Sequence, residues 1–254
     1  NFWLIKFPKF IVVELLIAFF GAGIIVFIIG FYISKKFCNF KTDDSALFGL
    51  ASCFGNSVAL GIPLMYSILG KINAMPYMIL VLFHGLIHFT YTTLIIEIYR
   101  NRAQSMSIKF FKPILGLLKN IVLFGMIIGF TLNYFQIYFP IKLQSLLIPI
   151  SMIALPAVLI SLGMALANFG FKKDLKYSFI LTALKNFIHP LIAFIISKYI
   201  LSMPSLMVFI VTIAASLPSG SQSYYFSYRY NSLQNVISAN VVISTFVSFF
   251  TIYL

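Results

Sequence analysis

Charged residues are scarce in this sequence of 254 residues: only 9% are Asp, Glu, Lys or Arg, whereas 61% are hydrophobic. About a quarter of the residues of a water-soluble domain are charged, so the composition excludes such a domain. Apolar residues fill long uninterrupted runs and do not alternate with polar ones, as they would in the strands of a membrane barrel. The sequence therefore predicts an all-α membrane protein.

Several kinds of chemical group are also missing. The two cysteines, Cys38 and Cys53, are spaced neither for a metal site nor for a disulfide framework. No Gly-rich phosphate loop followed by Lys-Ser/Thr is present, so ATP-driven machinery is not expected. No catalytic triad, metal site or carboxylate pair lies at mid-depth in an apolar segment. We therefore expect no enzyme, no cofactor, no metal and no carboxylate relay for sodium or protons.

Apolar segments long enough to cross a bilayer recur along the whole chain. We place eight of them, at 11–33, 46–68, 75–98, 113–134, 145–167, 177–200, 204–228 and 234–254. No soluble domain interrupts them, which predicts a single membrane domain over 1–254 with the lipid bilayer as its surroundings.

Basic residues account for the net charge of +13, and most of them lie in loops on one side of the predicted bundle. The loops after the first, third, fifth and seventh segments hold Lys35, Lys36, Lys41, Arg100, Arg102, Lys109, Lys112, Lys172, Lys173, Lys176 and Arg229. The positive-inside rule makes this side cytoplasmic and places both ends of the chain outside the cytoplasm of a multi-pass cell-membrane protein. Because the charge sets orientation, nucleic acid is not an expected partner.

Two apolar segments contain polar, proline-containing interruptions. The second segment carries NSVALGIP at 56–63, and the seventh carries SLPSGSQS at 216–223. The second and seventh segments are five segments apart, and because this number is odd the two cross the membrane in opposite directions. An inverted repeat of three helices has this arrangement. Proline disfavours helical geometry at the preceding residues, Ile62 and Leu217. Unwound backbone at membrane depth lines a cavity or is buried in protein, so we expect a binding site near the midplane that attracts anions.

Ionisable side chains also fall at mid-depth. Lys185 lies about nine residues into the sixth segment, too deep to reach the interface easily. It pairs either with a substrate carboxylate or with carbonyls freed at a helix break, and a purely structural lysine is an equal alternative. His84 and His88 share one helix face and His189 lies in the sixth segment, but no further ligands favour metal or haem. Their role in proton handling stays open.

The run FGNSVALGIPL at 54–64 resembles the F-x-N-x-x-x-x-G-x-P-L signature of the auxin efflux carrier family of membrane transporters. Further matches follow in the order of the family at 128–133, 155–166, Lys185 with Pro190, 217–220 and Ser244-Thr245. The resemblance implies ten helices in two inverted repeats, with two crossed, proline-broken helices in a transport domain beside a scaffold. By this comparison the chain, which begins at Asn1, lacks the first two helices. It then comprises first-repeat transport helices at 11–98, scaffold helices at 113–167 and second-repeat transport helices at 177–254.

The resemblance further implies secondary transport of a small organic anion, a carboxylate or dicarboxylate, by an elevator movement. The expected substrate-binding residues are Asn56, Ser57, Gly61, Pro63, Lys185, Pro218, Ser219, Gly220 and Gln222. Small-residue pairs, Gly125 with Gly129 and Gly163 with Ala167, suit a homodimer through the scaffold helices. A membrane receptor or sensor that binds a ligand in the same cavity without transporting it is the alternative.

Overall fold

The computed structural model describes residues 9–100 and 175–252, together with isolated positions between 128 and 164. Most of the described residues form helices, and their one extended pairing is an isolated bridge between Gly55 and Ser219. The prediction of an all-α membrane protein is therefore confirmed. The segments expected at 113–134 and 145–167, with their small-residue pairs, lie almost entirely outside the described residues.

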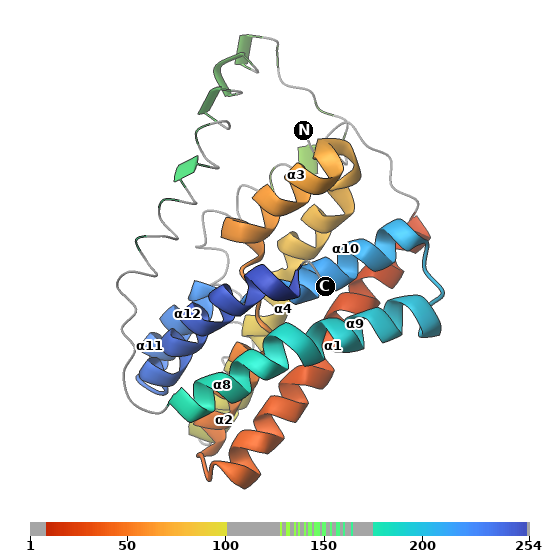
Figure 1. The fold of residues 1–254 in the computed structure, drawn as a ribbon. Coiled ribbons are helices and arrows are strands. Elements are labelled where there is room, and N and C mark those ends of the chain that lie inside the picture. Colours follow the sequence, from red (N-terminus) through yellow and green to blue (C-terminus); the bar gives the residue numbers. More distant parts are fainter. Residues whose placement is uncertain are drawn as a thin grey trace.

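Four helical stretches are long and apolar enough to cross a membrane (Figure 1). They are α1 (Lys9–Phe37), α4 (Met75–Arg100), the continuous run α8 (Leu175–Ala183), η3 (Leu184–Ile188), α9 (His189–Ile195) and η4 (Ile196–Ile200), and α12 (Gln234–Thr251). A rise of about 1.5 Å per residue gives an 18-residue helix a length close to the bilayer core. The segments predicted at 11–33, 75–98, 177–200 and 234–254 match these stretches.

The other two described segments are broken in the middle, as predicted for 46–68 and 204–228. The first consists of α2 (Thr42–Cys53), the π-helical turn η2 (Ser57–Gly61) and α3 (Ile62–Asn73). The second consists of α10 (Ser205–Ser216) and α11 (Ser221–Tyr230). Each half is shorter than the bilayer core, as expected if the two halves of each pair together make one crossing.

The first break lies in a different place from the one predicted. Ile62 is helical, with φ −63° and ψ −50°, so the expectation of unwinding there is wrong. The chain leaves the helix at Phe54, and the side chain of Asn56 accepts a hydrogen bond from the Ala59 backbone N–H at 3.2 Å. This cap starts a new helix before the proline, and Pro63 lies within that helix, directly after the π-helical turn η2. Leu217 is extended, as predicted, with φ −55° and ψ 144°.

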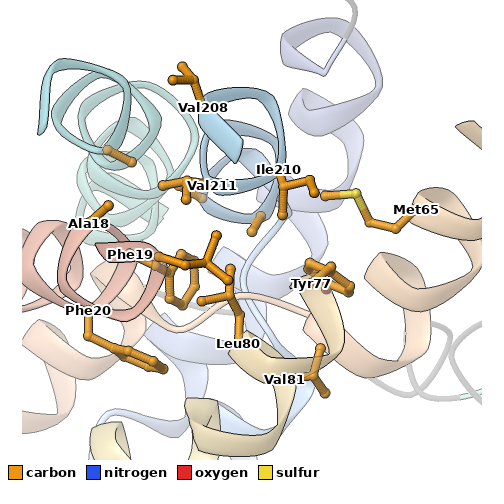
Figure 2. Packing of buried hydrophobic residues seen from close by; sticks show 14 of the residues in the cluster. Ala18, Phe19, Phe20, Met65, Tyr77, Leu80, Val81, Val208, Ile210 and Val211 are labelled. Carbon is orange, nitrogen blue, oxygen red and sulfur yellow. The ribbon is translucent and has the colours of Figure 1, made fainter. Parts of the chain in front are cut away.

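Small residues bring α1 and α2 into close contact. A methyl group on Gly30 would lie 2.6 Å from the Ser52 Oγ, and one on Gly49 would lie 2.8 Å from the Phe27 carbonyl oxygen. Buried side chains from α1, α4, α10 and α3 then pack into a core beside the breaks, where Figure 2 shows Phe19, Tyr77 and Ile210. The core thus joins both broken segments to α1 and α4.

Candidate binding site where two broken helices cross

The two unwound segments pair directly with each other. The Asn56 N–H donates to the Pro218 carbonyl at 2.7 Å, and the Gly220 N–H donates to the Phe54 carbonyl at 3.0 Å. These bonds make an antiparallel bridge between Gly55 and Ser219. Backbone groups that have left a helix need such partners in hydrocarbon, where water is absent. The predicted crossing of two oppositely directed, unwound spans is therefore confirmed.

Glycine is required next to this bridge, at position 220. A Cβ on Gly220 would lie 2.8 Å from the Gly55 carbonyl oxygen and 2.9 Å from a ring carbon of Phe54. Real Cβ atoms do not approach neighbours so closely, so only the absence of a side chain lets the two backbones meet.

Lys185 lies at the crossing and is fully buried. Its ammonium donates to the Ala215 carbonyl at 2.6 Å, near the end of α10. That carbonyl is free because the Ser219 N–H, its helical partner in an unbroken helix, donates to the Ser244 Oγ at 2.7 Å. A Cβ on Gly55 would lie 3.5 Å from the Lys185 Nζ. Lys185 therefore pairs with a carbonyl freed at a helix break, one of the contacts expected from the sequence.

A proline and a set of amide contacts position Lys185. Pro190 has no N–H to donate to Asn186 four residues earlier, and the His189 N–H reaches back five residues to the Leu184 carbonyl instead. The resulting π-helical turn, η3, contains Lys185. The Asn186 amide donates to the Ser244 carbonyl at 3.1 Å, which fixes this turn against α12.

The first crossover has polar partners on α4 that the sequence did not identify. The Ser57 Oγ lies 3.0 Å from the His84 Nδ1, and the Tyr77 hydroxyl donates to the Ser57 carbonyl at 2.6 Å. The ring of Phe54 stacks on His84 with 4.2 Å between centroids. The spacing of seven residues between Tyr77 and His84 places both on one face of α4, but it does not indicate that the two groups meet the same serine.

Most of the predicted site residues come together at the crossing. Asn56, Ser57, Lys185, Pro218, Ser219 and Gly220 are all buried there. Gly61 is buried against the Tyr77 hydroxyl, one helical turn from the bridge. Pro63 and Gln222 are half-buried in the first turns of α3 and α11, beyond the bridge. The roles of all these residues in binding stay predictions.

Lys185 is the basic side chain at the crossing. Three acidic side chains lie away from the crossing: Asp43 binds Arg100, Asp44 binds Ser232, and Glu97 interacts with Tyr230. Within the described residues, no group of three His, Cys, Asp or Glu side chains is arranged to hold a metal ion. An ammonium beside freed backbone groups is suited to hold an anion.

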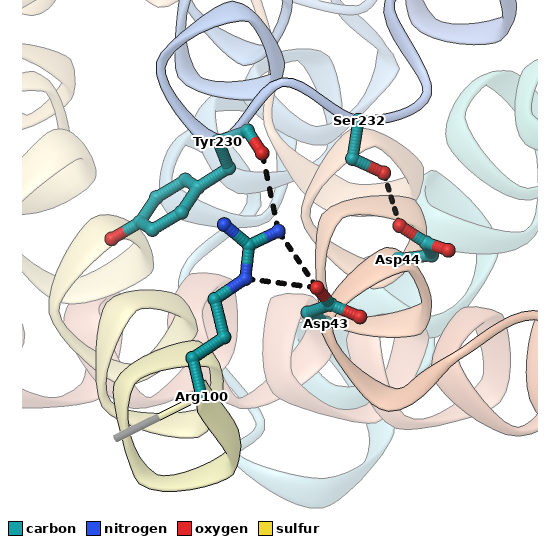
Figure 3. Close-up of polar contacts among 5 residues, drawn as sticks. All are labelled: Asp43, Asp44, Arg100, Tyr230 and Ser232. Carbon is teal, nitrogen blue, oxygen red and sulfur yellow. Dashed lines mark hydrogen bonds and ion pairs between the residues drawn. The ribbon is translucent and has the colours of Figure 1, made fainter.

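A second polar cluster ties the helices together at one end (Figure 3). The Arg100 Nε donates to the Asp43 Oδ2 at 2.9 Å, and the guanidinium also donates to the Tyr230 carbonyl at 3.1 Å. Ser232, in the turn before α12, donates to Asp44. We call these five residues the end cluster. It connects the start of α2 with the ends of α4 and α11.

Comparison with known proteins supports what this geometry indicates. A model of the membrane transport protein family matches residues 8–254. The chain belongs to this family. It is therefore a membrane transporter of the auxin efflux carrier type, and the resemblance seen in its sequence is confirmed. No curated protein matches the chain. The family and the four long apolar helices make this transporter a multi-pass membrane protein.

Proposed function

We propose that this transporter carries a small organic anion, a carboxylate or dicarboxylate, bound where its two broken helices cross. The observation that carries the proposal is Lys185, whose buried ammonium lies beside the backbone of both unwound segments. An ammonium has three donors, and the Ala215 carbonyl accepts one of them. A buried cation is costly unless it is paired, so a carboxylate brought in from water is its complement.

An elevator movement is the form of transport that the packing favours. The bridge joins the two broken helices, and the end cluster joins them to α4. The Asn186 and Ser219 bonds add α12 to the same body. These elements would move together and carry the site across the membrane past segments 113–167, which we assign to the scaffold and to a homodimer contact.

We assign the end cluster to the cytoplasmic side of the cell membrane. Arg100 and Arg229 lie there by their positions at the ends of α4 and α11, and Lys35 and Lys41 flank the turn that leads into α2. An excess of Lys and Arg in short loops marks the cytoplasmic side. Both ends of the chain then lie on the opposite side.

The test is counterflow of radiolabelled mono-, di- and tricarboxylates into proteoliposomes loaded with the same unlabelled acid. We expect exchange of one class of acid. Lys185→Ala and Asn56→Ala should each lower it roughly tenfold or more, because losing a hydrogen bond to a charged group costs about 1.5–3 kcal/mol. Lys198→Ala is the matched control, since Lys198 lies on the same span and contacts the rings of Phe194 and Tyr199.

Transport at the wild-type rate by both Lys185→Ala and Asn56→Ala would refute the site. Binding of an acid without any counterflow would instead favour the alternative function, a receptor or sensor that uses the same cavity. The amount of each variant inserted in the membrane has to be measured alongside, because both residues are buried.

A further inference from the structure

All three histidines of the chain gather at one place. His84 and His88 come from α4, and His189 begins α9. Each is at most 4% exposed, and their rings surround Phe19, with centroid distances of 5.6, 6.4 and 5.8 Å. The rings of His84 and His88 are 4.7 Å apart. We call these three residues the histidine cluster.

The hydrogen bonds of the cluster leave ring nitrogens available. The His88 Nδ1 faces the His84 carbonyl at 2.9 Å, and a carbonyl only accepts, so this nitrogen carries a proton. The His88 Nε2 then holds a lone pair in the neutral ring. Within the described residues, this nitrogen, the His84 Nε2 and both nitrogens of His189 have no hydrogen-bond partner. Such burial costs about 1–3 kcal/mol for each group.

Two of these nitrogens turn toward the same spot beside α1. A Cβ on Gly23 would lie 2.9 Å from the His88 Nε2 and 3.8 Å from the His189 Nε2. Because Gly23 has no side chain, imidazoles from two different spans approach a common space.

The cluster is connected to the crossing. His84 stacks on Phe54 and contacts the Ser57 Oγ, and His189 follows Lys185 by one helical turn. Lys185 interacts electrostatically with all three imidazoles. Three other titratable groups lie near the imidazoles. Tyr91 is next to His88, Cys53 is next to Tyr91, and the Tyr77 hydroxyl donates to the Ser57 carbonyl. Glu14 lies half-buried on α1, more than one turn before Phe19.

We propose that the histidine cluster is a proton-binding site that couples proton movement to transport of the anion held near Lys185. This proposal rests on the proposed function. A dicarboxylate has more negative charge than one ammonium balances, and in a low-dielectric site the excess needs a further positive charge. One imidazole takes a proton from water on the side to which the site is open and releases it on the other side, so proton and anion move in the same direction. Rings this close hold one such charge at a time, because two would repel.

The first test does not depend on the substrate. Protein labelled with 15N-histidine and embedded in nanodiscs gives signals from only these three imidazoles, and their protonation can be followed by NMR from pH 8 to 4.5. We expect uptake of one proton in total, shared among rings whose signals change together. Three imidazoles that stay neutral over the whole range, or that titrate independently, would overturn the proposal.

Two glycines of α1 offer a matched pair of variants. The methyl of Gly23→Ala would fill the space between His88 and His189, whereas a Cβ on Gly21 meets nothing within 4 Å. We expect Gly23→Ala to lose the shared proton uptake and Gly21→Ala to keep it. His189→Gln removes one ring directly and should also abolish it. Unchanged uptake in both Gly23→Ala and His189→Gln would contradict the assignment.

Counterflow and proton flux separate this proposal from the proposed function. With malate as the first dicarboxylate probe and pyranine inside the vesicles, wild-type protein should acidify the lumen as the acid enters, and His189→Gln should lose this acidification. Net entry of malate into vesicles that contain no acid, without a proton signal, would overturn the coupling and leave the carrier function standing. Histidine titration without counterflow of any acid would contradict the carrier function and leave the proton site standing.

Discussion

Gly220 lies where the two broken helices approach closely, and its lack of a side chain is a condition of the fold. A Cβ there would meet the Gly55 carbonyl oxygen and the Phe54 ring at 2.8 and 2.9 Å. Backbone atoms cannot move aside as a flexible side chain can. We expect Gly220→Ala to destabilise the protein by about 1–3 kcal/mol, the usual cost of overpacking, and to lower its thermal unfolding temperature in detergent.

Gly21→Ala is the control for this substitution, because it adds the same methyl group where no atom lies within 4 Å. Its unfolding temperature should stay the same or rise, since alanine favours a helix by up to about 1 kcal/mol over glycine. If Gly220→Ala unfolded at the wild-type temperature, the close approach at the crossing would be wrong.

At the scale of helices, the end cluster holds elements together, because one guanidinium at the end of α4 contacts the ends of two other helices. Arg100 contacts Asp43 at the start of α2 and the Tyr230 carbonyl at the end of α11, and its guanidinium lies 5.4 Å from the Tyr230 ring centroid. The Asp43 side chain is only 12% exposed, so removing its partner leaves a poorly hydrated charge. We expect Arg100→Gln to cost about 1–3 kcal/mol in unfolding experiments.

A double-mutant cycle with Asp43→Asn measures the pair itself, and a coupling energy near zero would show that the contact does not stabilise the protein. Lys35→Gln serves as the control. Lys35 also bridges to α2, through the Thr42 Oγ1 at 3.0 Å, but it does so at an exposed position where such contacts contribute little.

The order of helices and breaks follows from local rules, and the sequence therefore predicted it well. Apolar length identifies the spans, and the polar interruptions identify the broken ones. In the first broken span, the second half begins before the position predicted from Pro63. The reason is that the Asn56 side chain caps a helix that starts earlier in the sequence. The histidine cluster escaped prediction for another reason. The proximity of His189 to His88 depends on how α4 and α9 each pack beside α1, and no spacing within one helix encodes that packing.

The orientation of the whole molecule is testable with its two native cysteines. Cys38 is partly exposed just after α1, among Lys35, Lys36 and Lys41, whereas Cys53 is buried. With this end in the cytoplasm, a membrane-impermeant maleimide should label Cys38 in inside-out vesicles and leave it unlabelled in intact cells. A Cys38→Ser, Lys71→Cys double variant is the control, because position 71 is exposed at the opposite end of the broken span and should be labelled only from outside.

The pH dependence of the same reaction distinguishes Cys38 from a freely exposed thiol. Partial burial raises the pKa of the Cys38 thiol, and the nearby Lys176 ammonium offsets part of this effect. Maleimide reacts with the thiolate, so labelling in inside-out vesicles should be slower near pH 7 than that of an exposed cysteine and should accelerate as the pH rises past 9. Labelling of Cys38 from outside intact cells would show that the protein has the opposite orientation. The end cluster and its basic loops would then face away from the cytoplasm, against the distribution of charge along the entire chain.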